Sequence, residues 1–308
     1  MGAQMPSCPR FVTTAVTTCP PAAEVIDWGL KMHGIPNLWK TTRGEGIKIG
    51  VLDSGVAYKH PDLVQAIVKG KSFCTNNKSG YADVYGHGTH VCGIIAAREN
   101  NIGVIGVAPL SQLYIAKVLD DDGTVAIDKL CDGIAWCLDA GVDIISTSLW
   151  ISQGSDQLQE LINKAIDSGV IVVAAAGNGG SYDIDTVSYP AKYDRVISVG
   201  SHDACGLPDP TSAVGRRLDI LAPGRSILST YPPDIYATLS GTSMACPFVT
   251  GVVALLLASH RNDALGATPT YHSQSEVRKH LLAHAHDINA VGWDTASGFG
   301  LIDPAKTL

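Results

Sequence analysis

The stretch from residue 142 to residue 178 carries the pattern that decides the fold. It reads VDIISTSL (142–149), then SDQLQELINKAIDSG (155–169), then VIVVAAAGN (170–178). The first and third segments are short, β-branched and almost wholly apolar, which is typical of strands buried on both faces. The middle segment has its apolar residues at helical spacing. A strand, a helix and a second strand in this order indicate a parallel sheet.

The same alternation extends along the chain in both directions. We therefore expect an α/β fold with a doubly wound, mostly parallel sheet and helices on both faces. Further expected strands are IKIGVLD (47–53), QLYIAKVL (112–119), RVISVGS (195–201) and LDILAPG (218–224). Further expected helices are GHGTHVCGIIAAREN (86–100), AIDKLCDGIAWCLDAG (126–141) and SMACPFVTGVVALLLASH (243–260).

Length and composition favour one large globular domain. The chain has 308 residues, of which 45% are hydrophobic and 17% charged. We place the domain at residues 24–308 and expect residues 1–23 to form an N-terminal arm. The net charge of -7 includes no basic run, so no nucleic-acid partner is expected, and no segment predicts a membrane span. Charge says nothing about the substrate, and the oligomeric state is left open.

The N-terminus and the cysteines bear on the compartment. Residues 1–21 lack the charged start and uninterrupted apolar core of a secretory signal, which predicts a cytoplasmic protein. A secreted, processed fragment with an added Met would look the same. The eight cysteines form no CxxC pair, which favours reduced and mostly buried thiols, although their even number leaves disulfides open.

Polar residues interrupt the apolar strands at their carboxyl ends. Asp53 closes IKIGVLD, and Asn178 closes VIVVAAAGN. Sites on doubly wound sheets lie at these ends of the strands, so we expect both side chains to face one crevice.

Ser243 has two readings in LSGTSMACPFVTGVVALLLAS (239–259). A serine before an apolar helix is an ordinary capping residue that satisfies unpaired backbone N–H groups. It is also a candidate nucleophile, provided that an imidazole takes its proton and a carboxylate orients that imidazole. Asp53 in VLDSG and His87 in YGHGTHVCG supply these two groups. Ser243 at a helix N-terminus would also have a backbone N–H able to donate to an oxyanion, with the Asn178 amide as second donor.

Four motifs together resemble the subtilase family. VLDSG (51–55), GHGTHVCGIIA (86–96), AAAGN (174–178) and SGTSMACPF (240–248) stand in that family's order, and the similarity extends from about Trp28 to the C-terminus. The resemblance implies a serine endopeptidase in which Asp53 orients, His87 is the general base, Ser243 attacks and Asn178 holds the oxyanion. It favours the interpretation of Ser243 as a nucleophile over its interpretation as a capping residue only.

The resemblance also implies where substrate binds. A peptide or protein substrate would lie as an extended strand between STSLW (146–150) and DDGTVA (121–126), held by main-chain hydrogen bonds. The implied pocket has no buried charge, which predicts a preference for an apolar or aromatic side chain before the scissile bond. Its lining residues are Ser148, Leu149, Trp150, Ala175, Ala176, Gly177 and Ser188, with Val125 on the facing rim.

Several positions depart from the family pattern. Trp150 and Val125 stand where the family has small residues, so we expect a narrower cleft, and Phe248 replaces a histidine and is read as packing. Cys92 and Cys246 also replace small residues, on two helices expected to be neighbours; they are buried apolar groups or sensitive thiols. These departures keep open a catalytically reduced binding or maturation protein on the same fold, and an esterase would share the same machinery.

A calcium site is the one cofactor that the resemblance implies. Glu24, Asp62 and Asn100 would supply side-chain oxygens, and Arg98, Ile102 and Val104 would supply backbone carbonyls. Without an ion these residues would form an ordinary polar loop. Zinc at His87, His90 and Cys92, or metal binding by His280, His284 and His286, is a weaker alternative.

Overall fold

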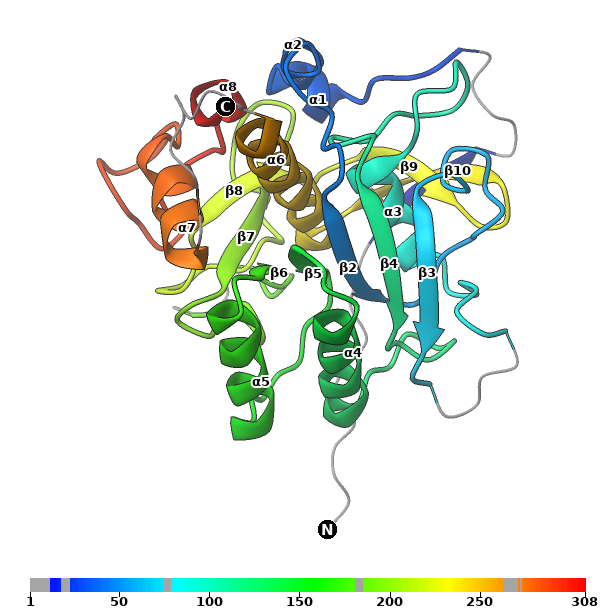
Figure 1. The fold of residues 1–308 in the computed structure, drawn as a ribbon. Coiled ribbons are helices and arrows are strands. Elements are labelled where there is room, and N and C mark those ends of the chain that lie inside the picture. Colours follow the sequence, from blue (N-terminus) through cyan, green and yellow to red (C-terminus); the bar gives the residue numbers. More distant parts are fainter. Residues whose placement is uncertain (1–11, 18–22, 75–78, 181–184, 263–270, 272) are drawn as a thin grey trace.

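The computed structural model describes residues 12–17, 23–74, 79–180, 185–262, 271 and 273–308. Its centre is a seven-stranded sheet in the order β3-β4-β2-β5-β6-β7-β8, and every neighbouring pair is parallel (Figure 1). The strands are β2 (Lys48–Asp53), β3 (Ile67–Ser72), β4 (Gln112–Lys117), β5 (Ile144–Thr147), β6 (Ile171–Ala175), β7 (Ile197–His202) and β8 (Ile220–Pro223). The predicted fold class is confirmed, and β3 is the one strand of this sheet that the sequence did not indicate.

The strand order reverses at β2. β4 and β3 lie on one side of β2, and β5 to β8 lie on the other. Doubly wound sheets place their sites outside the carboxyl ends of the strands at such a point, here β2 and β5. Asp53 ends β2, and Thr147 ends β5.

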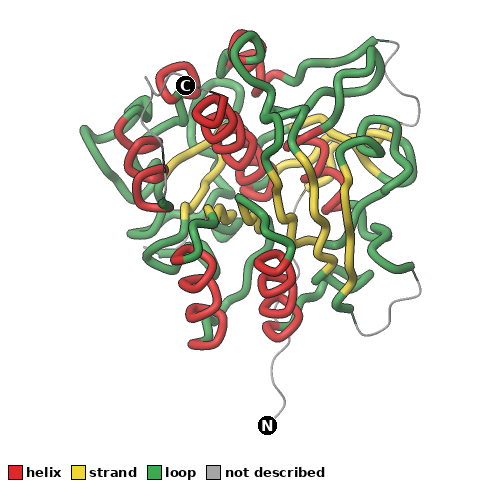
Figure 2. Tube along the Cα trace, in the orientation of Figure 1, coloured by secondary structure: helices red, strands yellow, loops and turns green. Residues whose placement is uncertain are grey.

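Helices cover both faces of the sheet (Figures 1 and 2). α3 (His87–Ala96) and α6 (Thr242–Asn262) pack in one hydrophobic cluster, and α4 (Ile127–Asp139) and α5 (Asp156–Asp167) pack in the other. Ser155 caps the N-terminus of α5, because its hydroxyl accepts a hydrogen bond from the Leu158 N–H. The shorter helices are α1 (Trp28–Met32), α2 (Ile35–Leu38), α7 (Gln274–Ala283) and α8 (Pro304–Thr307).

α6 is the central helix of the fold. It is long and apolar enough to cross a membrane, but 89% of its apolar window is buried inside the protein. It is therefore a core helix that packs against β5, β6, β7 and β8. The helix begins at Thr242, so Ser243 lies in its first turn and is not its cap.

A second, antiparallel sheet has the order β1-β10-β9. It consists of β1 (Val12–Thr17), β9 (Ile227–Tyr231) and β10 (Ile235–Ser240). β1 belongs to the segment predicted to be an arm, and its first residue lies opposite Ser240, three residues before Ser243. The domain boundary at residue 24 stays a prediction.

Candidate active site

The four residues expected to carry the chemistry lie at the carboxyl edge of the sheet. Asp53 ends β2, His87 begins α3, Ser243 is the second residue of α6, and Asn178 follows β6. The side chains of Asp53 and His87 are fully buried, and Ser243 is 1% exposed. Residues up to 190 positions apart in the sequence, Asp53 and Ser243 at the extremes, thus reach one edge of the sheet.

Asp53 and His87 form a buried pair. His87 Nδ1 lies 2.8 Å from Asp53 Oδ1, which also accepts a hydrogen bond from the Ser54 N–H at 2.7 Å. A Cβ on Gly88 would lie 2.2 Å from the Gly55 carbonyl oxygen and 3.1 Å from Asp53 Oδ1. The glycine after His87 is therefore what lets α3 approach the end of β2 closely.

The Ser243 hydroxyl forms a hydrogen bond with the backbone. Its Oγ donates to the Ser148 carbonyl oxygen at 2.8 Å, just beyond the end of β5. A hydroxyl that donates there must rotate before it can donate to an imidazole. Contacts between catalytic groups are commonly loose before substrate binds.

The Asn178 amide lies beside the start of α6. Its Oδ1 accepts hydrogen bonds from the Thr242 N–H at 2.9 Å and from Thr242 Oγ1 at 3.0 Å. These bonds fix the amide so that its nitrogen is the donor end. A Cβ on Gly241, whose φ is +147°, would lie 3.0 Å from that nitrogen. Glycine at 241 therefore gives the amide its room beside Ser243.

Most residues expected to line the substrate pocket lie next to one another. Ser148, Leu149, Ala175 and Ala176 are buried, and the Ser188 N–H donates to the Ala176 carbonyl at 2.9 Å. A Cβ on Gly177 would lie 3.0 Å from Ser188 Oγ, so Ser188 borders the glycine.

The two bulky departures differ in exposure. Trp150 is half-buried, and among the described residues its indole nitrogen has no hydrogen-bond partner. Val125 is only 2% exposed and belongs to the hydrophobic cluster of α4 and α5, paired with Leu119 in an isolated bridge. The Val125 side chain therefore packs in this cluster, and its place on the rim that faces the pocket stays a prediction.

Most of the described cysteines are buried, including Cys92 and Cys246. The six described cysteines are free thiols: Cys74, Cys92, Cys131, Cys137, Cys205 and Cys246. Cys92 and Cys246 lie in the same hydrophobic cluster, and their helices α3 and α6 pack together as predicted. Burial raises the pKa of Cys246 to about 11 and also raises that of Cys92 well above its ordinary value, so both are poor nucleophiles. Cys8 and Cys19 lie outside the described residues. Phe248 is buried against His33 with ring centroids 5.3 Å apart, as expected of a packing residue.

The side chains expected to bind calcium lie around one loop. The Asn100 N–H donates to Glu24 Oε1 at 2.8 Å, and Asn100 Nδ2 lies 2.9 Å from Asp62 Oδ1. The Ile102 N–H donates to Asn100 Oδ1, and the Val104 N–H to Asp62 Oδ2, each at 3.0 Å. The Arg98 N–H donates to the Asp62 carbonyl. All six expected residues thus belong to one hydrogen-bonded group.

The weaker metal alternatives have little support. Among the described positions, no three His, Cys, Asp or Glu side chains gather as a metal site would need. His90 Nε2 lies 3.1 Å from the Ile227 carbonyl and 3.0 Å from the Ala237 carbonyl, so it ties α3 to β9 and β10. The rings of His280 and His284 contact each other in a tilted arrangement, with centroids 4.4 Å apart.

Three functional neighbours were missed in the sequence: Ser54, Asp83 and Lys117. Asp83 is buried and bonded to the first turn of α3, and Lys117 is 1% exposed at the end of β4, opposite Asp53. A capping residue is expected directly before a helix, where Gly86 stands here, so neither Asp83 nor Lys117 gave a recognisable signal in the sequence.

The chain is similar to known proteins over most of its length. The model of the subtilase family matches residues 44–300. Subtilisin DY of Bacillus licheniformis is 43% identical over 247 residues, which cover 80% of this chain and 86% of that protein. Subtilisin of Bacillus pumilus is 41% identical over 258 residues, covering 81% and 93%. An intracellular serine protease of Paenibacillus polymyxa is 43% identical over 233 residues, covering 74% and 72%. The chain therefore belongs to the subtilase family and is a subtilisin-like serine endopeptidase.

Proposed function

We propose that Ser243, His87, Asp53 and Asn178 carry out peptide hydrolysis through an acyl-enzyme. Ser243 Oγ attacks the carbonyl carbon of the scissile bond while His87 takes the hydroxyl proton. The C–N bond then breaks, and His87 returns that proton to the leaving amine. Water repeats the sequence on the acyl-enzyme and releases the second product. Asp53 keeps the imidazole in the tautomer that accepts at Nε2 and stabilises its charged form.

The observation that carries this proposal is the buried Asp53–His87 contact of 2.8 Å at the edge of the sheet where Ser243 lies in the first turn of α6. The oxyanion of the tetrahedral intermediate would accept from two donors, the Asn178 amide and the Ser243 backbone N–H. The second is available because the first N–H groups of a helix have no partner within it. The hydrogen bond from Ser243 to the Ser148 carbonyl is a resting arrangement that the hydroxyl leaves during attack.

A fluorophosphonate probe tests this assignment against a catalytically reduced relative. We expect the probe to label the wild-type protein covalently at Ser243, and the Ser243→Ala and His87→Ala variants to give neither labelling nor peptide cleavage. Folded wild-type protein that fails to react with the probe would support the binding or maturation alternative. Cleavage of esters without cleavage of peptides would support an esterase.

We also propose a preference for apolar or aromatic side chains before the scissile bond. The supporting observations are the buried alanines 175 and 176, the neighbouring Gly177 and Ser188, and the absence of a charged residue among the described lining. Substrate would bind as an extended strand beside residues 146–150. Cleavage of a peptide library followed by sequencing of the products tests this preference. Enrichment of Lys or Glu at that position would refute it.

Calcium is the proposed structural ion. Side-chain oxygens of Glu24, Asp62 and Asn100, with carbonyls of Arg98, Ile102 and Val104, form an oxygen-only donor set, which suits a hard cation. The hydrogen bonds among Glu24, Asp62, Asn100 and Val104 show that these residues lie around one loop, which is the proximity that a shared ion needs. The ion would stabilise the loop, and no cofactor is needed for the chemistry. We expect calcium to raise the unfolding temperature of inactive Ser243→Ala relative to EDTA, and Asp62→Asn in that background to remove this dependence. Equal unfolding temperatures with and without calcium would refute the site.

A further inference from the structure

Asp83 is a buried carboxylate beside the Asp53–His87 pair. It is 7% exposed and accepts four hydrogen bonds. Oδ1 accepts from Ser54 Oγ at 2.9 Å and from the Gly86 N–H at 2.7 Å. Oδ2 accepts from the Thr89 N–H at 2.8 Å and from Thr89 Oγ1 at 2.6 Å. Four donors converging on two oxygens match the ionised form of the carboxyl group.

The partners of Asp83 flank the two residues of the pair. Ser54 follows Asp53, Gly86 precedes His87, and Thr89 lies in the first turn of α3. Ser54 Oγ also accepts from the Gly88 N–H at 2.9 Å. The end of β2 and the start of α3 are therefore joined through one carboxylate and one hydroxyl.

Asp83 also replaces a missing helix cap. The residue before α3 is Gly86, with φ of +97° and no side chain to cap the helix. Asp83 satisfies the N–H of Gly86 and of Thr89 instead, and its negative charge lies at the positive end of the helix dipole. His87 is the first residue of that helix, so the carboxylate bears directly on its position.

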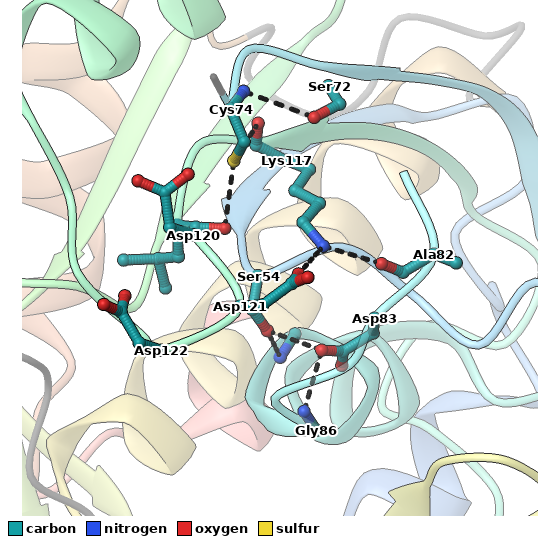
Figure 3. A network of polar contacts seen from close by, with 12 residues as sticks. Ser54, Ser72, Cys74, Ala82, Asp83, Gly86, Lys117, Asp120, Asp121 and Asp122 are labelled. Carbon is teal, nitrogen blue, oxygen red and sulfur yellow. Dashed lines mark hydrogen bonds and ion pairs between the residues drawn. The ribbon is translucent and has the colours of Figure 1, made fainter. Parts of the chain in front are cut away.

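Lys117 holds the Asp83 loop from the other side. Its ammonium donates to the Ala82 carbonyl at 2.8 Å and to Asp121 Oδ1 at 2.6 Å, and its side chain is 1% exposed. Figure 3 shows this lysine reaching the loop where Asp83 bonds with Ser54 and Gly86. The same loop pairs with the chain after Asp53 through a bridge between Val56 and Ala82.

We propose that Asp83 is a positioning residue for catalysis: through Ser54 and the first turn of α3 it sets the approach of His87 to Asp53, and its charge favours the imidazolium that forms during acyl transfer. This inference rests on the proposed function, because it assigns His87 the role of general base. Burial raises the pKa of Asp83, and the hydrogen bonds from Thr89 and Gly86 oppose that rise.

The other ionisable groups around Asp83 bear on any change in pH dependence that its replacement causes. They are Asp53 of β2, Lys117 of β4, Tyr231 of β9, His90 and Cys92 of α3, and Cys246 of α6. Burial raises the pKa of Tyr231 and of both thiols, and lowers that of His90 to about 3. None of these four groups therefore changes charge near neutral pH.

The test compares three full-length variants with wild type, using concentrations of active sites from fluorophosphonate titration. For Asp83→Asn we expect kcat to fall about 10- to 100-fold, as small displacements of catalytic groups do, with KM changed less than about threefold. The acid limb of its kcat/KM profile should move about half a pH unit lower, because a nearby negative charge is lost. Ser54→Ala keeps that charge, so we expect a fall in kcat of about three- to tenfold with the acid limb in place.

Asp219→Asn is the matched control. Asp219 is an equally buried carboxylate that accepts from Arg278 and from the Ser198 N–H, away from the pair. We expect this variant to unfold at a lower temperature while keeping its kcat and its acid limb.

The outcomes separate this inference from the proposed function. Wild-type kcat and acid limb in folded Asp83→Asn would overturn the inference, as would an equal shift of the limb in Asp219→Asn. If Asp83→Asn does not fold, unchanged kcat in Ser54→Ala overturns it instead. Cleavage that persists in His87→Ala overturns the proposed function itself.

Discussion

The protein should lose stability between about pH 7 and pH 5, because it folds around neutral imidazoles. His33 Nε2 and His202 Nε2 lie 3.0 Å apart, both rings are buried, and the pair joins the end of α1 to the end of β7. His202 Nδ1 donates to the Asp203 carbonyl at 2.8 Å, so the Nε2 of its neutral ring is an acceptor in this contact. Protonation of either ring would place a positive charge in a buried contact, which desolvation disfavours.

The magnitude follows from the pKa of each ring. Burial, with His202 alongside, lowers the pKa of His33 from 6.5 to about 4. The unfolded chain takes up this proton below about pH 6.5, and the folded protein does so only near pH 4, so stability rises with pH between these values. Between about pH 7 and pH 5, His33 alone should cost about 2 kcal/mol. His90, whose pKa burial lowers to about 3, should cost a similar amount.

Urea unfolding at the two pH values measures this loss. The experiment uses Ser243→Ala, in which the proposed nucleophile is absent and self-digestion cannot intervene. Replacing both partners, His33→Leu with His202→Val, avoids leaving one ring nitrogen unpaired. The double variant should lose at least about 2 kcal/mol less than its parent between about pH 7 and pH 5, and should keep the loss from His90. Equal losses in parent and double variant would refute the reasoning.

Three further changes test the site directly. In Gly88→Ala the new Cβ would lie 2.2 Å from the Gly55 carbonyl oxygen, so we expect kcat to fall about 100-fold, and kcat within threefold of wild type would contradict this. Asn178→Ala should lower kcat about 10²- to 10³-fold with little change in KM, a general magnitude for an oxyanion donor for which a subtilisin is itself the example. A KM effect alone would show that the amide only binds substrate. Trp150→Gly removes a bulky, half-buried side chain from the rim of the pocket. The ratio of kcat/KM for aromatic side chains to kcat/KM for small ones should therefore rise about tenfold, and an unchanged ratio in paired peptides would assign the indole to packing.

Most of the parallel sheet could be predicted because its strands are buried on both faces and read as apolar runs. β3 could not, because it has no buried residue and so does not read as an apolar run: its sequence IVKGKS carries lysines, which keep such an edge from pairing further. The antiparallel sheet was missed for another reason. β1 and β10 are more than 200 residues apart, and nothing local in either segment indicates its partner.

Some parts of the candidate site could likewise be predicted from the sequence, and others could not. Asp53, His87 and Ser243 stand in motifs whose chemistry is legible from residue type, so the sequence indicated them. The Ser148 carbonyl, which holds the Ser243 hydroxyl, is a backbone atom and leaves no trace in residue identity. Lys117 looks like any lysine at the end of an apolar strand, and only the fold reveals that its ammonium is buried against the Ala82 carbonyl.

The packing between α3 and α6 links the core to the chemistry. His87 begins α3 and Ser243 lies in the first turn of α6, and both helices lie on the same face of the sheet. The two helices pack together, and each carries a small, fully buried side chain of the same hydrophobic cluster, Cys92 on α3 and Cys246 on α6. Protein cores relax only partly when a side chain changes size. The spacing of imidazole and hydroxyl is therefore set by core side chains that never touch substrate, and Asp83 fixes the remaining freedom of α3 relative to β2.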